Sequence, residues 1–404
     1  MTGLDDQSLA SLLLEQSWAS HGVTHRDQRF VARANMWRDM LPAPLDRTIM
    51  GAGEGERRTA HYGAGWLVAK RDEGRVLTVT RAHWDAELIP RRRVEPAVGR
   101  YYPAGFIWKA GRGGIYRETR MPMRIVALDD DSLTVDLNHP LARFPIDLSV
   151  TVEAILEQGG PDNGGRVTDW GEVLTEGTGL QARHTDVRAD FLARQGPGRI
   201  DANDDAQFYR EPRLVAHLDA TASREVAKIH AELLAPGMRV LDLMSSVQSH
   251  LPEMTLGGVT GLGMNEAEMA ANGRLSESVV HDLNREPGLP FEGKSFDAAL
   301  CTASIEYLTD PISIVRDVAR VLKRGAPFAV TWSNRWFPSK AVDIWADLHP
   351  FERVGYVVDV FARSDAFAEL ETRSVQGYPR PAGDRYSATE PLSDPVFAVV
   401  GRRT

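Results

Sequence analysis

The feature that most constrains this chain is an alternation of apolar runs and helical segments that begins near residue 208. The apolar runs read RVLDLM, VTGLGM, SVVHDL, FDAALCTA and PFAVTWS, and each is short enough for a buried strand. Residues 310–325 predict a helix, because Pro311 stands in its first turn and a glycine ends it. Strands separated by helical segments indicate a parallel, doubly wound α/β sheet, whose ligands bind at the carboxyl ends of the strands.

The polar residues at those strand ends, taken in chain order, resemble class I S-adenosylmethionine-dependent methyltransferases of the type 11 kind. The resemblance spans about residues 215–335 and is strongest in LPFEGKSFDAALCTASIEYLTDPISIVRDVARVLKRGAPFAV. It implies a Rossmann-like methyltransferase sheet in residues 208–404, with S-adenosylmethionine as the cofactor. Asp242 would orient the loop around the methionine moiety, and Asp282 would accept the adenine amino hydrogens. The residues that the resemblance places at the cofactor are Asp242, Ser245, Ser246, Gly263, Asn265, Asp282, Leu283 and Cys301.

The loop after the first strand departs from the family pattern. It reads DLMSSVQSH and has no glycine, whereas the family has glycines that let the backbone approach the ligand and adopt positive φ. One interpretation is a working loop that stands further from the cofactor. Ser245 and Ser246 would then reach it with their hydroxyls, and Gln248 would bind the methionine carboxylate. The other interpretation is a methyltransferase fold that no longer binds the cofactor.

A second departure lies at the end of the second strand. Gly263 stands where the family usually has an acid that holds the ribose hydroxyls. Asn265 or Glu266, two and three residues later, could reach the ribose instead. Because Asp242 and Asp282 are both present at separate strand ends, we favour a competent cofactor site.

Two flanking segments, residues 208–222 and 333–345, can cover the substrate mouth in this fold. Both combine aromatic residues with Arg, His and Lys. The catalytic candidates are His217, as a general base, and Tyr209. The substrate-pocket candidates are Arg213, Asn334, Arg335 and Lys340. For each residue alone, a place on a helix surface or at a helix cap explains the residue type equally well.

Composition narrows the classes of partner. The net charge of −9 argues against nucleic-acid binding, and no apolar run approaches the roughly 20 residues of a membrane span. Cys301, the one cysteine, rules out an internal disulfide and suits a reducing cytosol, so we expect a cytoplasmic protein. Nothing in the sequence lowers the pKa of Cys301, which favours a small buried side chain over a nucleophile. No metal-ligand spacing is recognisable, so we expect no metal, and the oligomeric state stays open.

The N-terminal half has a different pattern. Short β-rich runs before residue 156 predict an α+β or antiparallel β domain, and residues 157–207 predict an irregular bridge. The turn NHPLA, residues 138–142, resembles the one that links two strands in SlyD-type FKBP prolyl isomerases, and residues 85–125 would be that family's inserted flap. Leu9, Leu12, Leu13 and Trp18 predict an amphipathic helix at the start of the chain.

Two functions from different classes follow. The first is a methyltransferase that acts on a small-molecule or peptide acceptor, with the FKBP-like domain as a recognition or chaperone-like module and with little prolyl isomerase activity. The second is a non-catalytic binding protein built on a degenerate methyltransferase scaffold. The glycine-rich break at 157–165 further predicts that a fragment beginning near residue 200 folds alone and keeps the cofactor site.

Overall fold

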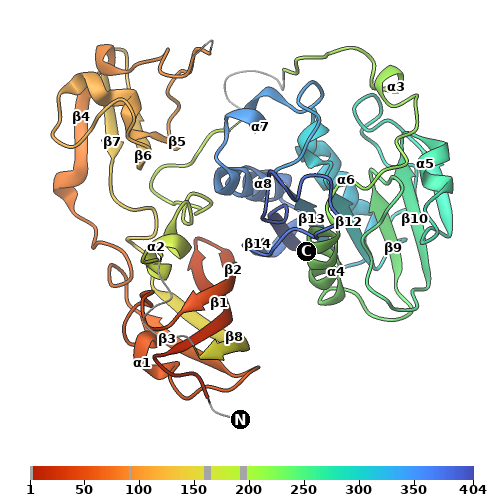
Figure 1. Cartoon of the computed structure of the whole chain (residues 1–404). Coiled ribbons are helices and arrows are strands. Elements are labelled where there is room, and N and C mark those ends of the chain that lie inside the picture. The colour runs from red at the N-terminus through yellow and green to blue at the C-terminus, as the bar shows by residue number, and fades with distance from the viewer. Residues whose placement is uncertain (1–2, 91, 159–164, 192–197) are drawn as a thin grey trace.

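The five strands predicted in the C-terminal half all form, and they are parallel to one another. The computed structural model describes residues 3–90, 92–158, 165–191 and 198–404. In chain order these strands are β9 (Arg239–Leu243), β10 (Gly258–Gly263), β11 (Glu277–Val280), β12 (Ala298–Thr302) and β13 (Pro327–Trp332). Two further strands, β14 (Phe367–Gln376) and β15 (Val396–Arg403), complete the order β11-β10-β9-β12-β13-β15-β14, in which β15 is antiparallel to both neighbours. Of these strands, Figure 1 labels β9, β10, β12, β13 and β14.

The helices of this half are uneven. They are α4 (Ala220–Ala231), α5 (Glu266–Ala270), the predicted α6 (Pro311–Val321), α7 (Asp343–Asp347) and α8 (Pro350–Ser364). Residues 244–257, all of them described, connect β9 to β10 without a helix, so the helix expected after the first loop is absent. Serine hydroxyls that bond locally and the proline at 252 both oppose a helix there. Within the described ranges, no helix combines the length and the apolar character that crossing a membrane requires.

The N-terminal half begins with long antiparallel strands. These are β1 (Ser8–Ser20), β2 (Val23–Asn35), β3 (Arg57–Tyr62) and β8 (Ile146–Gln158), with the short helix α1 (Leu45–Thr48) beside them. The amphipathic helix predicted from Leu9, Leu12, Leu13 and Trp18 is therefore wrong. Strand β1 lies between β2 and β8 and is buried on both faces, so its apolar residues follow neither a helical nor a strand period.

A second, four-stranded sheet is inserted between β3 and β8. It comprises β4 (Val76–Thr80), β5 (Tyr101–Pro103), β6 (Pro122–Leu128) and β7 (Ser132–Asp136). The predicted flap lies within it, but the side chains of Tyr102, Phe106 and Ile107 are buried in the core of this small sheet. The aromatic run of the flap is thus core, and of its aromatic residues Trp108 is partly exposed.

The predicted bridge contains little regular structure. Its described part holds the short helices α2 (Trp170–Thr175) and α3 (Asp205–Phe208). Leu180 and Phe191 nevertheless belong to the same buried cluster as the strands of the C-terminal half. Most of the glycine-rich stretch at 157–165 lies outside the described residues.

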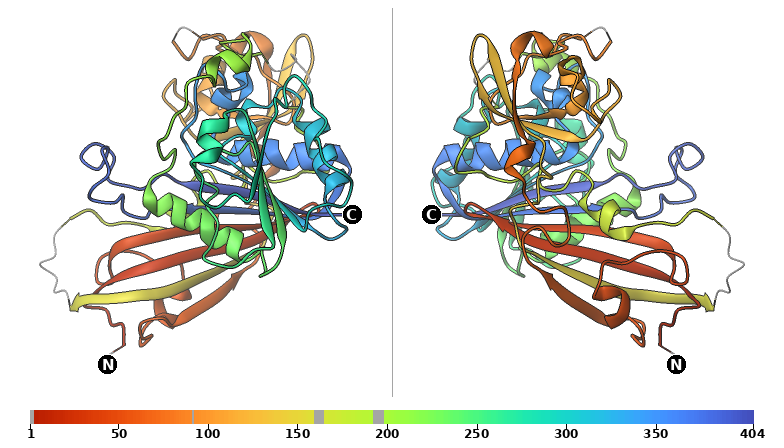
Figure 2. Two further views of the ribbon diagram at one scale, coloured as in Figure 1. Left: turned by 90° about the vertical axis from the view of Figure 1, so that its right-hand side faces the viewer. Right: turned by 90° about the vertical axis from the view of Figure 1, so that its left-hand side faces the viewer.

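The two halves share one sheet. Strand β14 pairs in parallel with β2, so the strands of both halves other than the inserted sheet form one eleven-stranded sheet, which continues through β2, β1, β8 and β3. Figure 2 shows the long N-terminal strands running beside the C-terminal ones. Across the junction, His25 Nδ1 lies 2.7 Å from Thr372 Oγ1, and the Ser374 hydroxyl donates to Asp27 at 2.8 Å, both buried. The boundary predicted at 208 therefore does not separate two independent sheets.

Candidate active site

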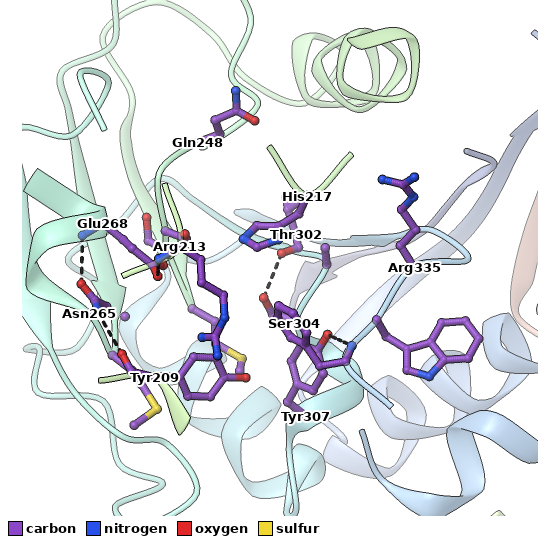
Figure 3. Close-up of a pocket in the computed structure, with 18 of the residues that line it drawn as sticks. Tyr209, Arg213, His217, Gln248, Asn265, Glu268, Thr302, Ser304, Tyr307 and Arg335 are labelled. Carbon is purple, nitrogen blue, oxygen red and sulfur yellow. Dashed lines mark hydrogen bonds between the residues drawn. The ribbon is translucent and has the colours of Figure 1, made fainter. Parts of the chain in front are cut away.

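A cavity of about 640 Å³ lies at the carboxyl ends of the parallel strands. Its volume is typical of a cofactor or small-molecule site. The segments 208–222 and 333–345 both contribute to it, as predicted, and Figure 3 shows the side chains that converge there. The predicted residues that line it are Tyr209, Arg213, His217, Asp242, Ser245, Ser246, Gly263, Asn265, Asp282, Leu283, Asn334 and Arg335, together with Gln248.

Two predicted site residues lie elsewhere. Cys301 is fully buried in the core beneath the strand ends, where burial raises the pKa of its thiol well above the usual value. Lys340 is also fully buried, and its ammonium lies 3.0 Å from Asp205 and 3.1 Å from Asp201. The assignments of Cys301 to the cofactor and of Lys340 to the substrate are therefore wrong in this geometry, because neither side chain reaches the cavity.

The glycine-free loop is held together by its own hydroxyls. The side chains of Ser245 and Ser249 both donate to one oxygen of Asp242, at 2.6 and 2.7 Å. The Ser246 hydroxyl donates to Glu268 on α5, at 2.6 Å. We had expected Ser245 and Ser246 to point at the cofactor, but both hydroxyls are committed to carboxylates of the protein. Burial raises the pKa of Asp242 to about 6, against the effect of the two serine hydrogen bonds, which lower it.

The backbone around the cavity carries conformations that usually belong to glycine. Among the described residues, Met244, His250 and Ala303 have φ of 57°, 47° and 51°, and all three line the cavity. The expectation that the loop avoids positive φ is therefore wrong: the methionine takes the left-handed conformation itself. Left-handed non-glycine residues cost free energy and are frequent at ligand sites, and three of the six among the described residues lie at this cavity.

Removing both hydroxyls from Asp242 is expected to raise the pKa of its carboxyl above about 6. Each hydrogen bond stabilises the ionised form, and the usual worth of one such bond, about 1 kcal/mol, corresponds to just under one pKa unit. The double variant Ser245→Ala, Ser249→Ala should therefore titrate higher, as followed by ¹³C NMR of the Asp side chain. Ser246→Ala, which removes a hydroxyl bound to Glu268, is the matched control and should leave the Asp242 titration in place.

The same pKa shift of Asp242 determines whether the stability of the fold rises or falls with pH. The folded-state pKa of Asp242 lies above the usual value of 3.8, so the folded state binds more protons between the two values. This carboxyl therefore lowers the stability of the fold as pH rises from about 4 to 6, and the double variant should extend that loss to higher pH. An unchanged Asp242 titration in the double variant would contradict the hydrogen-bond assignment.

Gly263 is required by packing. A β-carbon at this position would overlap the backbone oxygen of Ser245, because the loop lies directly against the end of β10 and Ser245 N donates to Leu262 O at 2.8 Å. The acid that the family uses for the ribose therefore has no room at 263. Asn265 does not replace it, since its side chain caps α5 and donates to the backbone oxygen of Tyr209 at 2.8 Å. Glu266, the other residue considered, does not line the cavity.

Asp282 and Leu283, which the sequence predicts to hold the adenine, lie together at one end of the cavity. One oxygen of Asp282 accepts from the backbone N–H of Asn284 at 2.9 Å, which leaves the other free of hydrogen bonds to the described residues. Leu283 is buried beside it, and Leu262 and Leu308 add apolar surface for a flat ring. An acceptor carboxylate against an apolar wall suits adenine, which presents an amino donor on an aromatic plane. The residues present thus fit the adenosyl group, although the ribose has lost its family acid.

The roof contains the catalytic candidates. His217 packs against Phe337 with ring centroids 5.8 Å apart, and burial lowers its pKa, so the imidazole is neutral near pH 7. Burial also raises the pKa of Tyr209, which keeps its hydroxyl protonated. Arg213 lies over the rings of Phe208 and Phe337, at 4.3 and 5.3 Å. His217 can therefore accept a proton, whereas Tyr209 is no base and can only form hydrogen bonds.

The sequence interpretation missed a third part of the roof, in the connection from β14 to β15. Arg385, Tyr386 and Glu390 of this connection line the cavity. Its anchor is Arg380, whose guanidinium contacts Asp219 and Asp394 at 3.3 and 2.7 Å with all three side chains buried. The segment RPAGDRYSATEP is rich in arginine and acidic residues, and this composition was the signal available in the sequence. The composition did not indicate which cavity the segment would cover.

His250 also lies at this cavity, on the loop from β9 to β10. Its Nδ1 is 2.7 Å from the hydroxyl of Ser223 on α4, and burial lowers its pKa to about 4. Within the described part of the chain, no group of three or more His, Cys, Asp or Glu residues is arranged to hold a metal.

Comparison with known proteins bears on this half of the chain. Residues 246–330 match the family model described as "Methyltransferase domain". The C-terminal half carries a methyltransferase domain. It is of the class I, S-adenosylmethionine-dependent type, so S-adenosylmethionine is its cofactor.

The relatives of the methyltransferase domain are distant. Cycloartenol-C-24-methyltransferase 1 of Oryza sativa subsp. japonica is 31% identical over 125 residues, which cover 26% of this chain and 36% of that protein. The chain thus spans only about a third of the length of that relative. Among solved structures, a methyltransferase from Thermotoga maritima is 16% identical, with a TM-score of 0.32 over 45% of this chain and 89% of its own. One from Mesorhizobium loti is 17% identical, with a TM-score of 0.29 over 44% and 96%.

Proposed function

We propose that this protein transfers the methyl group of S-adenosylmethionine to a small-molecule or peptide acceptor in the roofed cavity. The observation that carries the proposal is the convergence of Asp242, Asp282 and the roof segments on one cavity at the strand ends. When bound, the cofactor supplies an electrophilic methyl group on a sulfonium. The chain holds the acceptor in line and excludes water, which is the main catalytic contribution available to such a site.

Each candidate has a task in this proposal. The free oxygen of Asp282 accepts the adenine amino hydrogen, and the carboxylate of Asp242, which lines the cavity, is placed for the positively charged methionine end. Neutral His217 takes the proton that a hydroxyl or amine acceptor loses. Tyr209 stays protonated and donates a hydrogen bond to the acceptor. The backbone of Met244 and Ala303, held in the left-handed region, shapes the wall of the cavity.

A non-catalytic binding protein is the second candidate. The observation that favours it is the loop from β9 to β10, which lacks both the glycines and the helix, and whose serines are bonded to Asp242 and Glu268. Such a loop presents no helix N-terminus to the ligand. Cofactor affinity separates the two candidates, because a closed, degenerate loop would not bind S-adenosylhomocysteine.

We further infer that the N-terminal half serves recognition, as the resemblance to SlyD-type FKBP domains suggested. The support is the turn at 138–142, which joins β7 to β8 where the inserted sheet meets the longer one. Asn138 bonds both the N–H and the carbonyl of Asp72, at 2.8 and 2.9 Å, and so ties together the two chain crossings into the inserted sheet. We expect little acceleration of prolyl-peptide isomerisation by this half.

Calorimetry with S-adenosylhomocysteine tests the proposed function. We expect one site, and we expect Asp282→Asn to weaken it by about 1–3 kcal/mol. The asparagine oxygen can still accept from Asn284, while its amide group meets the adenine amine donor to donor. Asp130→Asn, an exposed change on the inserted sheet, is the matched control and should bind as the parent does. Absence of any binding at millimolar ligand would rule out the methyltransferase and leave the second candidate.

A further inference from the structure

Three acidic side chains lie at one side of the cavity and two arginines at the other. Asp242 and Asp282 lie at the ends of β9 and β11, and Glu268 lies near them on α5, on the side that the cofactor would occupy; Arg213 also lies on this side, beside Glu268. Arg335 and Arg385 lie on the roof, after β13 and in the connection from β14 to β15. In Figure 3, Glu268 stands on one side of the cavity and Arg335 on the other. An acidic floor suits a cationic cofactor, and a basic roof suits an anion beside it.

The two roof arginines share one aromatic ring. The guanidinium carbons of Arg335 and Arg385 each lie 4.6 Å from the centroid of Tyr386. Two like charges on one small ring repel each other, and a bound anion between or beside them relieves that repulsion. Within the described residues, the side chain of Arg385 makes no hydrogen bond and no ion pair, so no acidic side chain neutralises its charge.

The acids near this pair are already engaged. Asp394 contacts Nε of Arg335 at 3.1 Å and Arg380 at 2.7 Å, so one carboxylate is shared by two guanidiniums. Glu390 contacts Arg380 as well, at 3.1 Å. Both Nη groups of Arg335 are left without a hydrogen bond to the described residues. The roof therefore keeps unused guanidinium N–H groups beside the cavity.

The surfaces between the floor and the roof arginines are flat and apolar. Tyr307 holds the backbone N–H of Phe337 through its hydroxyl at 2.9 Å, which fixes both rings at the cavity wall. Trp336 lines the same wall and lies under the guanidinium of Arg353. A ligand with a planar apolar body would contact these rings, and a carboxylate on that body would meet the planar N–H groups of the roof.

We propose that the methyl acceptor has a flat, apolar body that bears a carboxylate in addition to the hydroxyl or amine that is methylated, and that Arg335 and Arg385 bind this carboxylate beside Tyr386. The methyl carbon passes from the sulfonium to that oxygen or nitrogen, and the proton that the acceptor loses goes to His217. This inference rests on the proposed function and adds the chemical class of the acceptor. The same carboxylate chemistry has a second source, namely the methionine end of the cofactor, and the experiment must separate the two.

The probe is 2-naphthoate, with naphthalene-2-carboxamide as its uncharged counterpart. Binding of each to the full-length protein is measured by calorimetry, with and without saturating S-adenosylhomocysteine. We expect the carboxylate to bind about tenfold or more tightly than the amide, because the amide cannot form charge-assisted bonds. Arg385→Gln and Arg335→Gln should each weaken naphthoate by about tenfold. Arg324→Gln, an exposed change of the same kind away from the cavity, should have no effect.

Several results would overturn the proposal. They are the absence of naphthoate binding at millimolar concentration, equal affinity for the amide, and variants that bind naphthoate as Arg324→Gln does. Arg335→Gln removes a contact to Asp394, so the fold of this variant is checked by circular dichroism. Arg385 is exposed and makes no such contact, so the result for Arg385→Gln decides the test by itself.

The cofactor arm compares S-adenosylhomocysteine with 5′-methylthioadenosine, which lacks the amino-acid end. If Arg335→Gln and Arg385→Gln weaken the binding of S-adenosylhomocysteine but not that of 5′-methylthioadenosine, the two arginines hold the cofactor, and the acceptor proposal is wrong. If naphthoate binds as expected while S-adenosylhomocysteine does not bind at all, the methyltransferase proposal fails and the anion site stands.

Discussion

A fragment that begins at residue 200 is expected to lose the cooperative fold of the methyltransferase domain. The fragment keeps β14 but removes β2, which pairs with it from Leu370 to Gln376. It also removes Val23, Tyr101, Leu180 and Phe191 from the large buried cluster that the C-terminal strands and α8 share. Burial of each such side chain is worth about 1.5–3 kcal/mol. Their sum is comparable to the roughly 5–15 kcal/mol that stabilises a whole domain.

The measurement is urea unfolding followed by near-ultraviolet circular dichroism. We expect no cooperative transition for residues 200–404 alone and a cooperative one when residues 1–199 are co-expressed with them, because the second piece restores β2 and the shared core. This expectation replaces the independent folding predicted from the glycine-rich break. A lone fragment with the midpoint of the full chain would show that the junction contributes little.

Restoring the acid of the family at position 263 is expected to abolish cofactor binding. The change Gly263→Asp brings a β-carbon onto the backbone oxygen of Ser245 and to 3.1 Å from the sulfur of Met269. The loop must then move away from β10 and give up the bond from Ser245 N to Leu262 O. Overpacking of this kind costs about 1–3 kcal/mol, and backbone overlap belongs at the upper end of that range.

The matched control is Gly273→Asp. That glycine is exposed, and a β-carbon there meets nothing within 4 Å. Thermal unfolding should therefore show a lower melting temperature for Gly263→Asp but not for Gly273→Asp. Calorimetry should likewise show loss of S-adenosylhomocysteine binding for Gly263→Asp but not for Gly273→Asp. Tighter binding by Gly263→Asp would mean that the loop yields and that the acid simply regains the ribose.

The sequence could predict the elements that depend on residues close together in the chain, and it could not predict the contacts between residues far apart in the chain. Strands β9, β10, β12 and β13 were predictable because each is a continuous apolar run with both faces buried. Helix α6 was predictable from its local signals, among them Asp310, whose side chain caps the helix at Ser313 N. These features depend on residues a few positions apart.

The misses involve distant partners. Strand β1 looked helical because its apolar residues show no alternation: it is a central strand between β2 and β8, and it has buried residues on both faces. The junction of β2 with β14 joins His25 to Thr372, which are 347 residues apart, and leaves no local pattern. Ser246 looked free to bind a ligand, yet Glu268 on another element takes its hydroxyl. Tertiary hydrogen bonds of this kind cannot be inferred from the spacing of one loop.

The continuous sheet also limits how copies of this chain can pair with one another through open strand edges. Two separate sheets would present four open edges, each able to recruit a strand from a neighbouring molecule, whereas the joined sheet has two. One is β11, which is only four residues long, and the other is β3, which begins with Arg57 and Arg58. A short edge and a charged edge are both poor templates for intermolecular pairing. Joining the halves therefore protects the long β14 from aggregation as well as supporting the cavity.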